Sequence, residues 1–170
     1  MGSVFLDDFD KQLDWFIATP LTGALGAGAI SANANEVQCF RFVLKQTRDF
    51  NNLVCGTTVA SAGGKAGFGI YNADGSSLLV DSGVIDTSTP TGQRNIPCVR
   101  KARLNAGDSL IFAAACDSAT AQFRNYLYAQ LLWFDFNKIA SNPMVGGRLP
   151  ATLGNFTTNG SSLPVVRWMA

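Results

Sequence analysis

The chain has 170 residues, of which 47% are hydrophobic and only 15% are charged. Its formal net charge is +1, so it lacks the basic excess that proteins binding nucleic acid usually carry. No run reaches the ~20 apolar residues of a membrane-spanning helix, so we expect one domain that binds neither nucleic acid nor membrane. The low charge and the 12 Phe residues fit either a Phe-rich core or an apolar surface that a partner covers.

Residues 1–35 are expected to form an N-terminal arm and linker. Apolar residues recur at helical spacing between Val4 and Ile17, which predicts a short helix that ends before Pro20. One face of this helix is an apolar stripe formed by Phe5, Phe9, Leu13 and Phe16. Residues 21–29 are rich in glycine and alanine, as linkers are. The stripe either packs on its own domain or docks on a neighbour, and the linker favours the second interpretation.

From Glu36 to residue 138 the sequence predicts an antiparallel β-sandwich. Short runs of alternating apolar residues are separated by turn signals at spacings of about 8–12 residues, which is typical of all-β sandwiches. Eight large side chains of these runs are expected in the core: Phe40, Phe42, Leu53, Phe68, Ile70, Leu110, Phe112 and Leu132.

Residues 67–83 predict a β-hairpin at the centre of this region. Phe68 and Ile70 alternate with small residues, as a half-buried strand requires. The turn is expected at Asn72–Gly75, because Asn and Asp tolerate left-handed backbone and glycine has no Cβ to clash. Leu78–Val80 then resumes the extended run.

The densest basic run is Arg100-Lys101-Ala102-Arg103. Neighbouring residues of a strand point to opposite faces, and exposed basic side chains are typical of a solvated edge strand that resists aggregation. A patch for an acidic neighbour is the competing interpretation.

Residues 125–136 are the most apolar predicted strand, and both of its faces are hydrophobic. The second layer of a sandwich covers one face only, so the arm or another subunit is expected to cover the other. Three aromatic residues form a possible ligand-binding cluster here: Phe123, Tyr126 and Tyr128. Packing in a core or an interface explains such clusters more often than a sugar site does.

Beyond Asn137 the strand pattern ends, and residues 139–170 are expected to be an extended C-terminal tail. Its isolated apolar residues offer anchors at Leu149, Leu153, Phe156, Leu163, Val165 and Trp168. We expect Trp168 to contact a partner, as the stripe of the arm does. One interior cannot easily cover the arm, the two-faced strand and the tail, so we expect a homo-oligomer.

The residue inventory argues against catalysis and against a bound metal or cofactor. The chain has no histidine, so Ser-His-Asp and Cys-His nucleophiles and the usual zinc sites are missing. Its cysteines lie in apolar runs without a C-x-x-C pair, at Cys39, Cys55, Cys98 and Cys116. Buried free thiols are the default interpretation, although spacing alone leaves a disulfide open. Calcium in the turn Asn72–Ser76 is disfavoured, because the glycine comes early and the closing glutamate is missing.

Three motifs, in this order, resemble the jelly-roll domains of tailed-bacteriophage virion proteins. The first is the hairpin Gly69-Ile70-Tyr71-Asn72-Ala73-Asp74-Gly75, which is followed by Asp81-Ser82-Gly83. The second is the turn Leu104-Asn105-Ala106-Gly107-Asp108 before an apolar strand. The third is Leu149-Pro150-Ala151-Thr152-Leu153-Gly154, with Leu163-Pro164 further on.

This resemblance implies a jelly-roll fold and a structural role in the virion. The expected function is that of a capsid decoration, cement or head-fibre-like subunit, assembled in the host cytoplasm. Its expected partners are copies of itself, as a trimer, and other virion proteins such as the major capsid protein. The alternative is a receptor- or carbohydrate-binding module of a tail fibre or tip, since jelly rolls support both functions.

Overall fold

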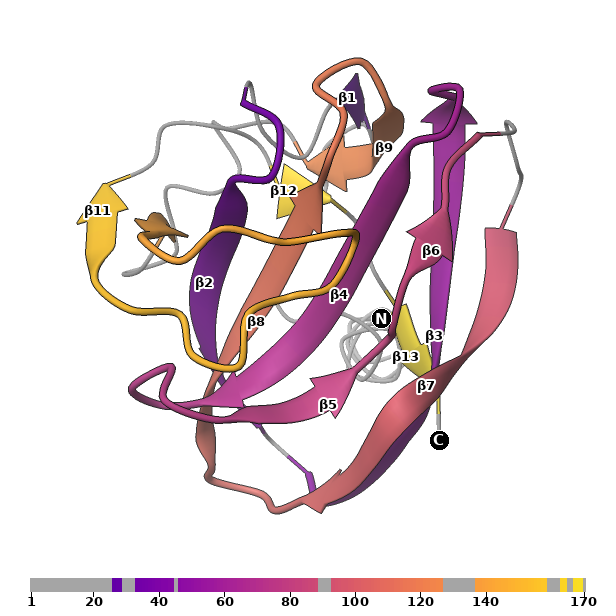
Figure 1. The fold of residues 1–170 in the computed structure, drawn as a ribbon. Coiled ribbons are helices and arrows are strands. Elements are labelled where there is room, and N and C mark those ends of the chain that lie inside the picture. The colour runs from indigo at the N-terminus through magenta and orange to yellow at the C-terminus, as the bar shows by residue number, and fades with distance from the viewer. Residues whose placement is uncertain are drawn as a thin grey trace, which may run out of the picture.

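A computed structural model describes residues 26–28, 33–44, 46–88, 93–126, 137–158, 163–164 and 167–169. Every regular element in these ranges is a β-strand, and no helix that could cross a membrane lies among them (Figure 1). The helix expected near the N-terminus lies outside the described residues. The strands are β1 (Gly26–Gly28), β2 (Val37–Val43), β3 (Arg48–Val59), β4 (Lys65–Asn72), β5 (Leu78–Asp81), β6 (Ile85–Asp86), β7 (Gln93–Leu104), β8 (Ser109–Cys116), β9 (Gln122–Tyr126), β10 (Asn137–Ala140), β11 (Phe156–Thr158), β12 (Leu163–Pro164) and β13 (Arg167–Met169).

The described strands pair antiparallel along one continuous path. Its order is β1-β9-β3-β7-β5-β4-β8-β2-β10-β11, with β12 beside β9, β13 beside β3 and β6 beside β4. The two halves of the path meet where Asp81 of β5 lies opposite Arg100 of β7. Figure 1 shows β4 and β8 side by side on one side of the molecule, and β3 and β7 together on the other. This all-β antiparallel arrangement is consistent with a β-sandwich.

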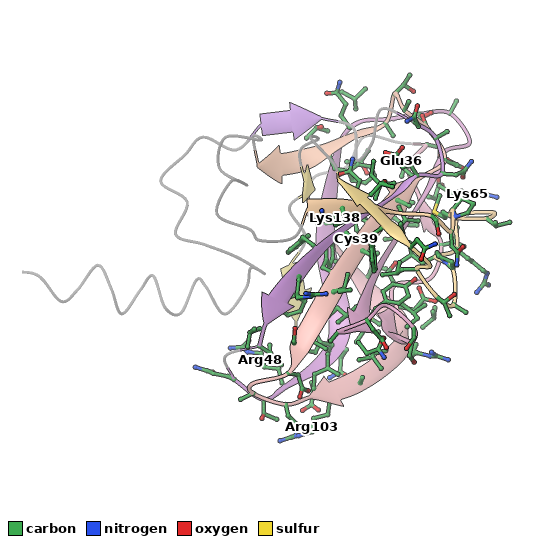
Figure 2. The ribbon with its side chains drawn as sticks, turned by 90° about the vertical axis from the view of Figure 1, so that its left-hand side faces the viewer. Glu36, Cys39, Arg48, Lys65, Arg103 and Lys138 are labelled. Carbon is green, nitrogen blue, oxygen red and sulfur yellow. The ribbon has the colours of Figure 1, made fainter. Side chains whose placement is uncertain are left out.

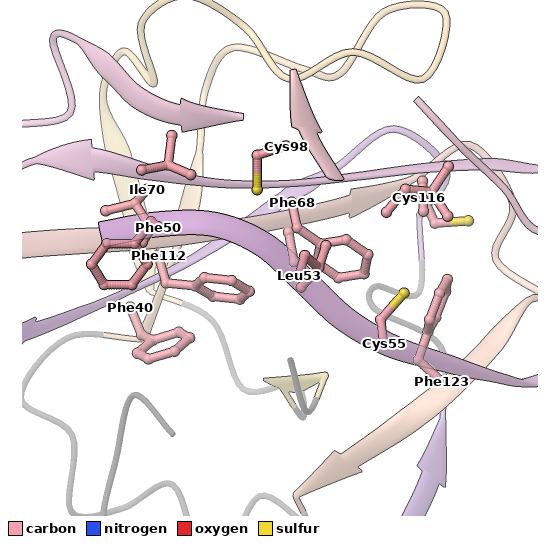
Figure 3. Packing of buried hydrophobic residues seen from close by; sticks show 14 of the residues in the cluster. Phe40, Phe50, Leu53, Cys55, Phe68, Ile70, Cys98, Phe112, Cys116 and Phe123 are labelled. Atoms are coloured by element: carbon pink, nitrogen blue, oxygen red, sulfur yellow. The ribbon is translucent and has the colours of Figure 1, made fainter. Parts of the chain in front are cut away.

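The main core lies between these halves. Phe68 is at its centre, because its ring stacks on Phe112 at 6.3 Å between centroids and meets the edge of Phe123 at 5.8 Å (Figure 3). Six of the expected core residues are buried: Phe40, Leu53, Phe68, Ile70, Leu110 and Phe112. Phe42 is only partly buried, since it lies near the end of β2 and packs against the rim of the core. Leu132 lies outside the described residues.

The predicted hairpin is confirmed. It joins β4 to β5, and Gly75 takes a left-handed φ of 75° that a residue with a Cβ would rarely adopt. The Gly75 N–H donates to the Asn72 carbonyl at 3.0 Å, and the Asn72 N–H donates to the Ser77 carbonyl at 3.1 Å. The first bond closes the predicted turn Asn72–Gly75, and the second closes the hairpin loop at Ser77.

The segment expected to be an extended tail packs instead on the outer face of β2, β4 and β8 as far as residue 158. β10 adds to the edge of β2, and β11 adds to β10. The residues between these strands cover a second apolar cluster, to which they contribute Met144, Leu149 and Leu153. The Tyr71 hydroxyl donates to the Pro150 carbonyl at 2.5 Å, and the Leu153 N–H donates to the Gly75 carbonyl at 2.8 Å.

This covering segment should contribute strongly to stability. Leu153 is fully buried, so Leu153→Ala should lower the free energy of unfolding by about 2–5 kcal/mol, through lost burial and an unfilled cavity. Val43 of β2 is 61% exposed and lies outside this segment, so Val43→Ala should change the free energy of unfolding by less than about 0.5 kcal/mol. Urea denaturation of both variants measures the difference. If both substitutions change the free energy of unfolding by equally small amounts, the segment does not unfold cooperatively with the sheet.

Candidate interaction surface

Of the three residues of the expected aromatic cluster, the structure describes the side chain of Phe123. Phe123 is only 1% exposed and belongs to the main core, so it cannot stack on a sugar. Tyr126 lies at the end of β9, where its backbone pairs with Leu163. Tyr128 lies outside the described residues.

The expected partner-contacting residues are only partly placed. The stripe residues Phe5, Phe9, Leu13 and Phe16 lie outside the described residues. Trp168 lies in β13, opposite Leu53 of β3 in the strand register. The backbone at Trp168 therefore adds to its own sheet, which the sequence did not indicate.

A different apolar group is exposed, which we call the valine surface and define by three residues. Val84, Val99 and Val145 are 42%, 67% and 74% exposed. They come from distant parts of the sequence, and a glycine lies close to each of the first two. A Cβ on Gly83 would lie 2.7 Å from Val99 Cγ1, and a Cβ on Gly147 would lie 2.8 Å from Val84 Cγ1. Val145 begins the turn that contains Gly147 and pairs with Arg148.

The backbone at the valine surface is tightly specified. Gly83 and Gly147 have left-handed φ values of 70° and 82°, which strongly favour glycine. The Gly83 N–H donates to Asp81 Oδ1 at 2.8 Å. Ser82 Oγ accepts the Phe68 N–H and donates to the Gly83 carbonyl, both at 2.9 Å. These bonds fasten the bend before Val84 to the buried strand β4.

Charged residues of both signs lie near the valine surface. Four exposed cations lie beside it in sequence or in space: Lys65, Arg100, Lys101 and Arg148. The Lys65 Cβ lies 2.8 Å from the position of a Gly147 Cβ, so its stem borders Val84. Three carboxylates are also near: Asp81 accepts the Gly83 N–H, Asp86 lies opposite Lys65 in the strand register, and Asp117 Oδ1 accepts the Lys65 N–H at 2.6 Å. An apolar centre with a charged rim is the usual layout of a protein–protein contact.

The basic run of β7 does not act as one patch. The Arg100 guanidinium donates to the Leu78 carbonyl, beside the valine surface. Arg103 instead forms an exposed ion pair with Asp49 at 3.2 Å. Figure 2 shows Arg103 and Arg48 at one end of the molecule, well away from Lys65. Within the run, Lys101 is two residues from Val99 and shares its face of β7, whereas Arg100 points to the other face.

The polar turn Asn72–Ser77 satisfies its own hydrogen bonds. Asp74 Oδ1 accepts the Ser76 N–H at 2.9 Å, and Asn72 Oδ1 accepts the Ser77 N–H at 3.0 Å. The bond from Ser76 lowers the pKa of the Asp74 carboxyl. Among the residues described, no three His, Cys, Asp or Glu side chains are grouped so that they could hold a metal ion.

All four cysteines are free and buried, as the sequence predicted. Burial raises the pKa of the Cys39 thiol from 9.0 to about 12 and that of Cys98 to about 11. Burial also raises the pKa of Cys116. Thiols of this kind are weak nucleophiles at neutral pH, so they pack as small apolar side chains.

Comparison with protein-family models and with curated proteins finds no match to this chain. The valine surface was not predicted from the sequence. Its only signal there is an exposed apolar residue next to glycine in a predicted bend, as at Gly83-Val84 and Val145-Gly146-Gly147.

The buried thiols should make the fold less stable at alkaline pH. The folded state favours the neutral thiol of Cys39, because its folded pKa of about 12 lies above the ordinary 9.0. Its stabilising contribution is complete below the ordinary pKa and is lost as the pH rises toward the folded pKa. Each such thiol should lower the free energy of unfolding by up to about 1.4 kcal/mol per pH unit in that window. Urea titrations under reducing conditions at a series of pH values measure this slope.

The matched variant for this test is Cys39→Ala. It should be less stable at neutral pH, because it leaves a small cavity, yet its stability should fall less steeply at alkaline pH. Parallel pH profiles for the two proteins would show that Cys39 does not stay neutral in the fold.

Proposed function

We propose that this chain is a structural subunit of a tailed-phage virion, a capsid decoration, cement or head-fibre-like protein that binds and stabilises neighbouring virion proteins. The three sequence motifs that resemble such proteins support the virion context. The observation that carries a binding role is the valine surface: three exposed valines beside glycines with left-handed φ values, with charged residues near them. Such a layout fits a protein partner better than a small ligand.

The strand order supports a jelly roll. One half of the path is β1-β9-β3-β7, and the other is β5-β4-β8-β2. Successive main strands alternate between the halves: β2 lies in one, β3 in the other, β4 and β5 in the first again, and β7 in the second. Two facing four-stranded sheets with this alternation are the pattern of a double Greek key.

The proposed subunit is a homotrimer. In the sequence, the apolar stripe of the arm and the run 125–136, which is hydrophobic on both faces, hold more apolar side chains than one sandwich interior is expected to cover. Contacts between identical copies are the common way to cover such areas. The alternative, a sugar-binding module, requires exposed aromatic rings, and the burial of Phe123 disfavours it.

Two measurements on the purified full chain test this function. Light scattering should give the mass of three 18.1-kDa chains. The protein should also sediment with phage shells from which it has been removed, and the shells should become more resistant to heat. If the protein is a stable monomer that does not bind the shells but binds glycans on an array, the proposal is overturned in favour of the receptor-binding alternative.

A further inference from the structure

The turn between β4 and β5 contains a peptide bond that is prone to rearrange, and the covering segment between β10 and β11 packs against it. Asp74-Gly75 is the one Asp-Gly pair in the sequence. An aspartate before glycine isomerises more readily than one before a larger residue, because no Cβ hinders the glycine nitrogen. Asp74 is exposed, so water reaches its carboxyl group.

The reaction needs only this pair and water. The Gly75 nitrogen attacks the Asp74 carboxyl carbon, and a C–N bond forms while the carboxyl hydroxyl and the amide proton leave as water. The product is a succinimide, a cyclic imide whose nitrogen carries no hydrogen. Water then opens the ring at either carbonyl carbon and gives aspartate or isoaspartate. Isoaspartate carries the main chain through its Cβ and Cγ, which adds a methylene group to the backbone.

The hydrogen bonds of the folded turn oppose ring closure. The Gly75 N–H donates to the Asn72 carbonyl at 3.0 Å, and an imide nitrogen has no hydrogen with which to keep this bond. Asp74 Oδ1 accepts the Ser76 N–H at 2.9 Å, which holds the carboxyl group in place. The same bond lowers the pKa of the Asp74 carboxyl, so the neutral acid that reacts is scarce at neutral pH. The turn must therefore open before the ring can close.

The covering segment holds the turn closed. The Leu153 N–H donates to the Gly75 carbonyl at 2.8 Å, so Gly75 is bound through both its N–H and its C=O. A Cβ on Gly75 would lie 3.0 Å from Leu153 Cδ1 and from Phe156 Cζ, so these side chains leave the glycine little room. Gly75 is buried, although Asp74 and Ser76 on either side of it are exposed. The attacking nitrogen thus lies beneath the cover, while the carboxyl group lies outside it.

We propose that Asp74-Gly75 is a site of aspartate isomerisation that the covering segment controls. While Leu153 is in place, the ring cannot form; when the segment lifts, the Gly75 nitrogen is released and attacks the carboxyl group. The coupling is reciprocal, because the extra methylene of isoaspartate moves the Gly75 carbonyl away from the Leu153 N–H and weakens the cover. A chain whose cover has opened is thereby marked covalently. This inference does not depend on the proposed function.

Ageing of the purified full chain at neutral pH tests the inference. Peptide mass spectrometry with electron-transfer fragmentation locates isoaspartate at position 74 and separates it from any change at Asn159-Gly160. The folded chain should form it at least about tenfold more slowly than the chain unfolded in guanidinium chloride, because the reaction proceeds only from open states of the turn.

Leu153→Ala and Leu53→Ala form a matched pair, since each removes the same atoms from a fully buried leucine. Leu153 belongs to the second cluster beneath the cover, whereas Leu53 of β3 belongs to the main core. Leu153→Ala should raise the isomerisation rate at least about tenfold, because such substitutions usually cost more than the 1.4 kcal/mol that a tenfold change represents. Leu53→Ala should leave the rate nearly unchanged, since the turn opens without unfolding of the main core.

A milder variant keeps the test valid if Leu153→Ala does not fold. The Asn142 side chain donates from Nδ2 to the Thr152 carbonyl at 2.8 Å, within the covering segment. Asn142→Ala removes this bond and leaves every buried leucine in place. It should raise the isomerisation rate by a smaller factor than Leu153→Ala. Circular dichroism under the ageing conditions shows whether each variant is folded.

Equal rates in the folded and unfolded chains would overturn the inference, because the fold would then give no protection. Equal increases in Leu153→Ala and Leu53→Ala would also overturn it, since protection would then come from global folding rather than from the cover. An unchanged rate in both Leu153→Ala and Asn142→Ala would have the same meaning. If no isoaspartate forms even in the unfolded chain, Asp74-Gly75 is not a modification site.

Discussion

The structure depends on strands that are apolar on both faces. Leu110 to Cys116 of β8 are all buried, although alternate residues point to opposite sides of the sheet. Phe112 faces the main core, whereas Ile111 belongs to the second cluster. Such a strand is stable in water only if both faces are covered. One cover is the facing half of the sheet path, and the other is the segment between β10 and β11.

Much of the sheet could be predicted from the sequence, because residues that face the core alternate along a strand with residues that do not. Phe68 and Ile70 alternate with small residues, and both are buried as expected. The second cover could not be predicted in this way, since an irregular segment has no period to recognise. Its anchors are single residues whose partners lie far away in sequence: Tyr71 and Pro150 are 79 positions apart. Leu153 was expected to be an anchor, but the sequence did not show what it would contact.

The valine surface was missed for a related reason. Each of its valines resembles an ordinary strand or bend residue in the sequence, and only the fold brings the three together. The left-handed glycines at 83 and 147 create the close approaches, and such approaches depend on backbone paths that composition does not reveal. For Phe123 the prediction erred in the opposite direction. This aromatic residue lies near a loop and was expected to be accessible to a ligand, yet it is buried between the strands.

The position of the covering segment also matters for biosynthesis. Residues 140–156 leave the ribosome after β2, β4 and β8, so the outer face of those strands is bare while the chain is still being made. A chain whose synthesis stops early keeps that apolar face exposed, together with the unpaired edge of β2. Incomplete chains are then substrates for chaperones and proteases. The outer face is therefore covered only once the chain has been made as far as β11.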